Sequence, residues 1–133
     1  MEGHDVRFLV VDDEPLVTTL IRRAFESDGH ACLAASTIVE ATQVVAREQL
    51  DGIVLDMQLP DGNGLRWLES VSHTRPDLTR KTVVATGADV ASEDRRRITD
   101  VGAVLLLKPF SLETLRSVFV DLIEKGGRRW RSA

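Results

Sequence analysis

Short apolar runs alternate along the chain with amphipathic stretches of helical length. Runs of four or five residues rich in Val, Ile and Leu are typical of β-strands. Five such runs occur along the chain, and the last three of them are nearly all apolar, as expected of strands covered on both faces. We therefore predict a sheet with helices packed against both of its faces. The predicted strands are Arg7–Val11, Ala31–Ala34, Gly52–Leu55, Thr82–Ala85 and Val104–Leu107.

A segment with helical periodicity follows each predicted strand. Pro15 suits a first helical position and Gly29 a C-terminal cap, so the first helix should run from about Pro15 to Asp28. Ser36 is expected to open the second helix, which should stop near Glu48. Three further helices are predicted: one ending before Pro76, one beginning at Ser92 and one capped by Ser111.

Five repeats of strand then helix predict an α/β fold with a parallel sheet and right-handed crossovers. Five strands are too few for an eight-stranded barrel, so we predict an open, doubly wound, three-layer sandwich with strand order 2-1-3-4-5. The length of 133 residues fits one domain. We expect that domain to span residues 1–125, with residues 126–133 forming a basic C-terminal tail or linker stub.

The composition restricts the cellular setting. A net charge of −4 and a pI near 5.4 argue against direct nucleic-acid binding by this domain and against binding to anionic membranes. No apolar run approaches the roughly 20 residues that cross a bilayer, and the N-terminal residues lack a signal-peptide pattern. We expect a cytoplasmic protein. Cys32, the only cysteine, is expected to be a small buried hydrophobe, and His4, His30 and His73 are expected at the surface.

The informative polar residues follow the predicted strands. Asp12 and Asp13 end the first strand, Asp56 the third, Thr86 the fourth and Lys108 the fifth. Ligands of open parallel sheets bind at the carboxyl ends of the strands. Because the first and third strands are neighbours in the predicted order, their carboxylates should converge.

Converging carboxylates repel one another, and a hard cation such as Mg²⁺ offsets that repulsion. A carboxylate can also attack phosphorus to give an aspartyl phosphate. A cation and a lysine ammonium then neutralise charge on the transferring group, and a threonine hydroxyl can donate to it. The pattern therefore predicts phosphoryl chemistry that depends on Mg²⁺.

Four segments carry a family resemblance: FLVVDDEP at residues 8–15, LDMQLPDGNG at 55–64, VVATGA at 83–88 and LLKPF at 106–110. In this order and spacing, they resemble the receiver domain of two-component response regulators, which has a flavodoxin-like (βα)5 fold. The resemblance covers nearly the whole chain.

The resemblance implies a role for each residue. Asp56 would be the phosphoacceptor, and Mg²⁺ would be bound directly by Asp13, Asp56 and the backbone carbonyl of Met57. Asp12 would act mainly through a metal-bound water. Thr86 would be the switch hydroxyl and Lys108 the phosphoryl partner, with a cis peptide bond between Lys108 and Pro109.

The resemblance also implies partners. A sensor histidine kinase or histidine-phosphotransfer protein would donate the phosphoryl group, and a downstream protein or output domain would recognise the product; a homodimer is left open. Such a module is not an enzyme beyond catalysing its own phosphorylation and dephosphorylation. The chain would be either a single-domain regulator or the receiver portion of a longer protein.

Two other functions are considered. Leu105 stands where the family usually has an aromatic residue that moves with the threonine, which keeps a phosphorylation-independent pseudo-receiver adaptor as an alternative. A haloacid-dehalogenase-like phosphatase would need an Asp-x-Asp pattern after the first strand, and Asp12-Asp13 does not supply it.

Simple structural roles are expected for the remaining polar residues. Asp61 and Asn63 are interpreted as turn residues, and Glu14 as an acid favoured by the first helix dipole. The run Arg95–Arg97 is interpreted as a solvated helix face, and Trp67 as a residue at the edge of the core.

Overall fold

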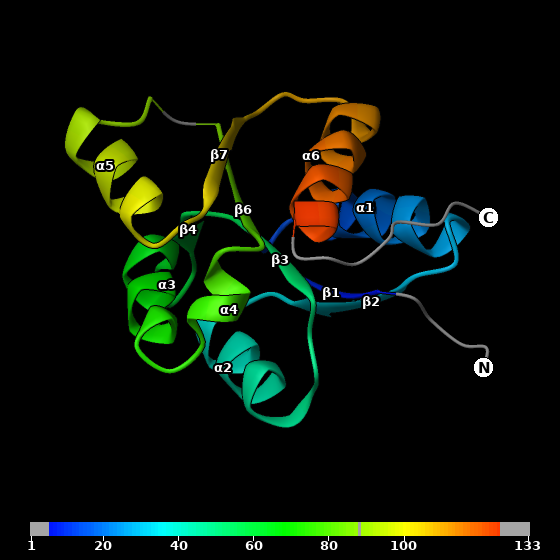
Figure 1. The fold of residues 1–133 in the computed structure, drawn as a ribbon, viewed down its shortest axis with the longest axis horizontal. Helices are drawn as coiled ribbons and strands as arrows, with labels where there is room; N and C mark the ends of the chain where they lie inside the picture. Colours follow the sequence, from blue (N-terminus) through cyan, green and yellow to red (C-terminus); the bar gives the residue numbers. More distant parts are fainter. Residues whose placement is uncertain (1–5, 88, 126–133) are drawn as a thin grey trace.

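The computed structural model describes residues 6–87 and 89–125, and the predicted tail, residues 126–133, lies outside these ranges together with His4. The central sheet consists of five parallel strands in the order β2-β1-β3-β6-β7 (Figure 1). The fourth and fifth strands of this sheet are labelled β6 and β7, because β4 and β5 belong to a separate hairpin. The observed order is therefore the predicted order 2-1-3-4-5. The strands are β1 (Arg7–Val11), β2 (Ala31–Ala35), β3 (Gly52–Leu55), β6 (Thr82–Thr86) and β7 (Val104–Leu107).

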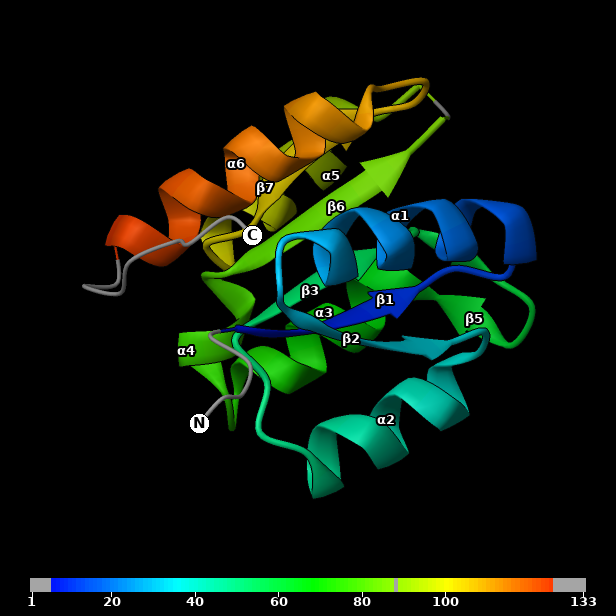
Figure 2. The ribbon, with the colours of Figure 1, turned by 90° about the vertical axis from the view of Figure 1, so that its right-hand side faces the viewer.

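Alternating side chains of the central strands fill two separate cores, one on each face of the sheet. On β1, Phe8 and Val10 enter one core while Leu9 and Val11 enter the other. The Phe8 core is covered by α1 (Pro15–Ser27) and α6 (Leu112–Lys125), which lie on the same side of the sheet (Figure 2). The opposite core is covered by α2 (Ile38–Arg47), α3 (Gly64–Ser72), α4 (Pro76–Thr79) and α5 (Ser92–Asp100). The predicted three-layer sandwich is confirmed.

The helix ends follow local capping chemistry, with one correction. Pro15 begins α1, and Gly29 just beyond its end has a φ of 86°, as a glycine after a helix C-terminus commonly does. The second helix is capped by Thr37 rather than by Ser36. The Thr37 side chain accepts a hydrogen bond from the Glu40 N–H, and the Glu40 carboxylate accepts from Ser36.

Three short elements were not predicted. Helix α4 begins at Pro76, where the preceding helix was expected only to have ended. Strands β4 (Gln58–Leu59) and β5 (Gly62–Asn63) form a small antiparallel hairpin directly after Asp56. Elements of two to four residues are too short to show a periodic pattern, which is why the sequence did not reveal them.

Burial corrects two further expectations and confirms others. His30 is buried beside Phe8, with ring centroids 6.1 Å apart, so its predicted surface position is wrong. The fifth predicted strand was expected to be covered on both faces, but β7 is an edge strand that is only partly covered, and Leu107 is 46% exposed. Cys32 is buried as expected, and burial raises the pKa of its thiol to about 12. Trp67 lies in the core with its indole N–H donated to Thr42.

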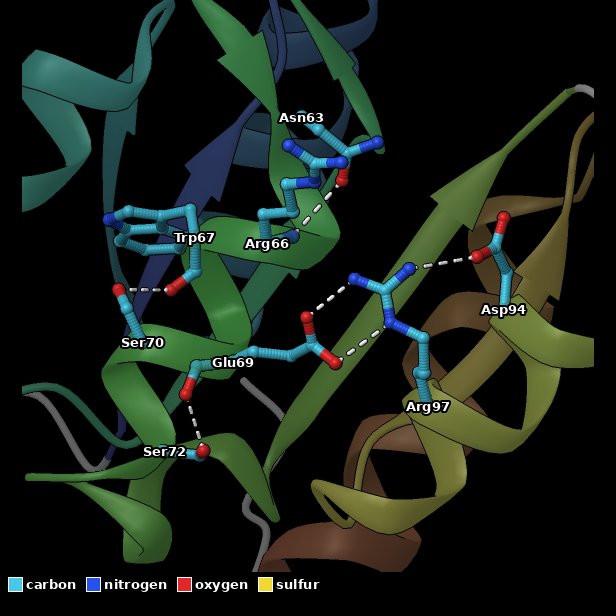
Figure 3. Close-up of polar contacts among 8 residues, drawn as sticks. All are labelled: Asn63, Arg66, Trp67, Glu69, Ser70, Ser72, Asp94 and Arg97. Carbon is cyan, nitrogen blue, oxygen red and sulfur yellow. Dashed lines mark hydrogen bonds and ion pairs between the residues drawn. The ribbon is translucent and has the colours of Figure 1, made fainter.

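Helix α5 is attached to the fold by one buried apolar side chain and by an ion pair. Ile98 is its buried residue. Arg97 donates two hydrogen bonds to the carboxylate of Glu69 on α3, and a third to Asp94 on its own helix (Figure 3). The predicted solvated face is therefore wrong for Arg97, whereas Arg95 and Arg96 are exposed as expected.

No helix within the described ranges is both long and apolar enough to cross a membrane.

Candidate functional site

Three carboxylates meet at the carboxyl ends of β1 and β3. These two strands are hydrogen-bonded neighbours, and Val11 pairs with Leu55, so the residues that follow leave the sheet side by side. One carboxylate oxygen each from Asp12, Asp13 and Asp56 lies within 4.8 Å of the other two. Asp12 is buried, Asp56 is partly buried and Asp13 is exposed. The predicted convergence of these three acids is confirmed.

Lys108 reaches these acids from the end of β7. Its Nζ lies 3.0 Å from Asp12 Oδ2 and 3.6 Å from Asp56 Oδ2. It also lies 3.5 Å from Glu14 Oε1, a contact that the sequence did not reveal. The peptide bond between Lys108 and Pro109 is cis, as the family resemblance implied.

The electrostatics of the pair formed by Lys108 and Asp56 reflect partial burial. Burial raises the pKa of Asp56, although the Gln58 N–H and the Lys108 ammonium act in the opposite direction. Burial by itself would lower the pKa of Lys108, but the hydrogen bond and charge of Asp12 outweigh it and raise that pKa above its ordinary value. Lys108 is therefore a stable cation beside Asp56 at neutral pH.

Thr86 completes the group of predicted side chains. It is the last residue of β6, is 2% exposed, and contributes to an open pocket together with Asp13, Asp56 and Lys108. A Cβ on the next residue, Gly87, would lie 3.7 Å from the Cβ of Lys108, which is an ordinary contact. The side chains around residue 87 would therefore leave room for a Cβ atom at this position. The rest of the pocket is lined by Glu14, Gln58, Leu59, Pro60 and Gly87.

The loop after Asp56 is tightly folded back on itself. Gly64 donates its N–H to the carbonyl of Met57 at 2.6 Å, and a Cβ on Gly64 would lie only 2.2 Å from the carbonyl oxygen of Asp56. Only glycine fits so close to the backbone. Met57 is buried at this point of the chain, so the peptide that follows Asp56 is held at a defined position.

Two residues of this loop cap helices, which the turn interpretation missed. The Asn63 side chain accepts from the Arg66 N–H at the start of α3 (Figure 3). Asp61 accepts from the backbone N–H groups of Ile38 and Val39 at the start of α2. No local signal in the sequence could identify this second contact, because its partners are more than 20 residues away in the chain.

The donor set fits a hard divalent cation. Carboxylate and carbonyl oxygens are the ligands that Mg²⁺ prefers. Both carboxylate oxygens of Asp12 are already engaged, one with Lys108 and the other with the Glu14 N–H. Asp13 is exposed, so it presents the most accessible oxygens of the three acids, while Asp56 is partly buried beside it.

Comparison with known proteins identifies the family. Residues 8–119 match the response regulator receiver domain. The chain belongs to this family. The receiver domain is 38% identical over 111 residues to the response regulator MprA of Mycobacterium leprae, covering 83% of this chain and 47% of MprA. It thus spans about half the length of the curated relatives that it matches.

Solved receiver domains have the same fold. The beryllofluoride-activated NtrC4 receiver domain dimer is 30% identical, with a TM-score of 0.81, over 90% of this receiver domain and 97% of that chain. A response regulator protein from Burkholderia pseudomallei is 25% identical, with a TM-score of 0.78, over 92% and 72% of the two chains. That protein contains a phosphorylated aspartic acid and a calcium ion. The predicted flavodoxin-like fold and family are confirmed.

Proposed function

We propose that this receiver domain accepts a phosphoryl group on Asp56 and that the phosphorylated form is recognised by a partner. Receiver domains are the signalling modules of two-component response regulators, and the chain belongs to that family. The observation that supports Asp56 in particular is its position, because it is a partly buried acid that lies beside both Asp12 and Asp13 and 3.6 Å from the Lys108 ammonium.

The side chains of the pocket can divide the work of phosphoryl transfer. A carboxylate oxygen of Asp56 attacks phosphorus, a P–O bond forms, and the P–N bond to the donor histidine breaks as its imidazole leaves. Lys108 holds positive charge beside the incoming group, and the Thr86 hydroxyl lines the same pocket. Mg²⁺ held by Asp13, Asp56 and the Met57 carbonyl, with Asp12 acting through a water ligand, would supply further positive charge.

The partners follow from the family. Receiver domains of response regulators interact with histidine kinases and output domains. For this protein we propose a sensor histidine kinase or a histidine-phosphotransfer protein as donor, and a downstream protein or output domain as receiver of the signal, in the cytoplasm. A homodimer is a further proposal, supported by the dimeric NtrC4 receiver domain.

The domain boundaries remain a proposal as well. The family match ends at residue 119 and α6 continues to Lys125. A domain of residues 1–125 followed by a basic tail at 126–133 is compatible with both. Its only catalysis would be its own phosphorylation and dephosphorylation.

Labelling with radioactive acetyl phosphate tests the assignment. Wild-type protein should incorporate label in the presence of Mg²⁺ and should incorporate none when EDTA is present from the start. Asp56→Asn should incorporate none, because the amide is not a nucleophile for phosphorus. Asp121→Asn, which changes an exposed acid on α6, is the matched control and should label like the wild type. Label that persists in Asp56→Asn would refute the assignment.

A further inference from the structure

The hairpin that follows Asp56 is tied at its tip to a helix that the site does not otherwise use. Asp61 Oδ1 accepts from the Ile38 N–H at 2.8 Å, and Oδ2 accepts from the Val39 N–H at 3.1 Å. These are N–H groups of the first turn of α2, which have no partner within their own helix. One carboxylate thus bridges the β4–β5 hairpin and α2.

The hairpin is too short to hold its own shape. Each of its strands has two residues, and an isolated hairpin even of ordinary length is marginally stable in water. Its attachments to the rest of the domain are the buried Leu59 side chain, the Asn63 cap on α3 and the Asp61 bridge to α2. The tip also sits close against α2, since a Cβ on Gly62 would lie 2.8 Å from Ile38 Cδ1.

The base of the same hairpin contains two backbone groups that follow the phosphoacceptor directly in the chain. The Gln58 N–H donates to Asp56 Oδ1 at 3.3 Å, and the Met57 carbonyl accepts from Gly64. Gln58 pairs with Asn63, and Leu59 with Gly62. Two paired positions therefore separate the tip from the Met57 carbonyl, which gives the tip a short path to the base.

We propose that Asp61 is a positioning residue for the metal site: its bridge to α2 holds the Met57 carbonyl and the Gln58 N–H where Asp56 chemistry needs them. This inference rests on the proposed function of the site. The hydrogen bond from Ile38 and, to a lesser degree, that from Val39 lower the pKa of Asp61, so the bridge is anionic at neutral pH. It touches no reacting atom and acts through the hairpin alone.

The chain offers a matched control on the same helix end. Thr37 caps α2 from its own side by accepting from the Glu40 N–H, and within the described part of the chain its side chain forms no hydrogen bond with the hairpin. Asp61→Ala and Thr37→Ala each remove capping acceptors from α2, so both should lower stability. Only Asp61→Ala also releases the hairpin, and therefore only that variant should change the metal site.

Calorimetric titration with Mg²⁺ alone separates the two effects. We expect Asp61→Ala to raise the Mg²⁺ dissociation constant by about tenfold, the low end of the range for groups that orient ligands, while Thr37→Ala leaves it within about twofold. Asp61→Asn should restore only part of the affinity, because its amide oxygen can replace one of the two acceptors, while its NH2 group cannot accept from the second N–H. Equal affinities in Asp61→Ala and Thr37→Ala would overturn the inference.

A second measurement does not require metal. In EDTA, the amide hydrogens of residues 57–64 should exchange faster in Asp61→Ala than in Thr37→Ala, at matched free energies of unfolding. Equal exchange in the two variants would also overturn the inference. A wild type that neither binds Mg²⁺ nor becomes labelled would refute the proposed function instead, whereas a normal wild type with an unaffected Asp61→Ala refutes only the positioning role.

Discussion

Asp56, the proposed phosphoacceptor, is placed at the expense of stability. Its carboxylate is partly buried and close to two other acids, and burial raises its pKa despite the opposing Lys108 ammonium. A raised carboxyl pKa means that ionisation is harder in the folded than in the unfolded chain. The ionised form at neutral pH therefore reduces the free energy of unfolding.

Asp56→Asn should consequently stabilise the metal-free protein. The neutral amide removes the cost of holding a partly buried charge, and we expect the free energy of unfolding to rise by about 1 kcal/mol at pH 7 in EDTA. Urea denaturation of the two proteins checks this. Asp121→Asn should leave stability nearly unchanged, and an Asp56→Asn protein less stable than the wild type would contradict the prediction.

At the scale of elements, α5 is joined to its neighbours by an ion pair as well as by an apolar contact. Ile98 is its buried residue, and the ion pair between Arg97 and Glu69 joins it to α3 (Figure 3). Both side chains are about one-third exposed, at 31% and 34%, so solvent screening limits what the pair contributes.

Glu69→Gln should loosen α5. We expect a loss of about 0.5–1 kcal/mol in the free energy of unfolding at pH 7, discounted for exposure, and faster amide exchange in residues 92–100. Asp121→Asn, which removes an exposed pair with Lys125, is the control and should cost less.

The same pair predicts a pH dependence. The hydrogen bond from Arg97 lowers the pKa of Glu69 below its ordinary value of 4.5. The stability contributed by the pair is therefore complete above that ordinary value and is lost as pH falls through the lowered pKa. Wild type and Glu69→Gln should differ at pH 7 and converge in acid. A difference that stays constant between pH 7 and pH 3 would contradict this.

At the scale of the whole molecule, the site exists only in the folded chain. Asp12 and Asp13 lie more than 40 residues from Asp56 in the sequence, and they meet because β1 and β3 are neighbours in the sheet. A cation that binds this cluster therefore binds the native state and has little affinity for the unfolded chain. Mass action then couples metal binding to stability.

Mg²⁺ should raise the free energy of unfolding of the wild type by about 2.7 kcal/mol at a concentration one hundred times its dissociation constant. Urea denaturation in EDTA and in Mg²⁺ measures the shift. Asp13→Asn should abolish most of it, and should be more stable than the wild type in EDTA because one of three repelling charges is gone. A wild type without a metal-dependent shift would contradict the site.

The strand-end residues could be found from the sequence because their placement depends on local pattern and on a general rule of topology. Apolar runs of four or five residues locate the strands, and the residues Asp12, Asp56, Thr86 and Lys108 follow them directly. A parallel sheet brings all carboxyl ends of its strands to one edge. The strand pattern was therefore enough to predict the fold and the cluster of acids, whereas the family was predicted from the resemblance of four segments to receiver domains.

Contacts between distant elements were decided only by the tertiary structure. The Asp61 bridge to α2, the Arg97 pair with Glu69 and the burial of His30 each depend on how separate helices and loops pack. None has a local signature, because a turn aspartate or a surface arginine looks the same in the sequence whether or not it has a distant partner. Hydrophobic periodicity thus determined the layers of this protein, whereas three-dimensional packing determined which polar side chains hold the layers and the site together.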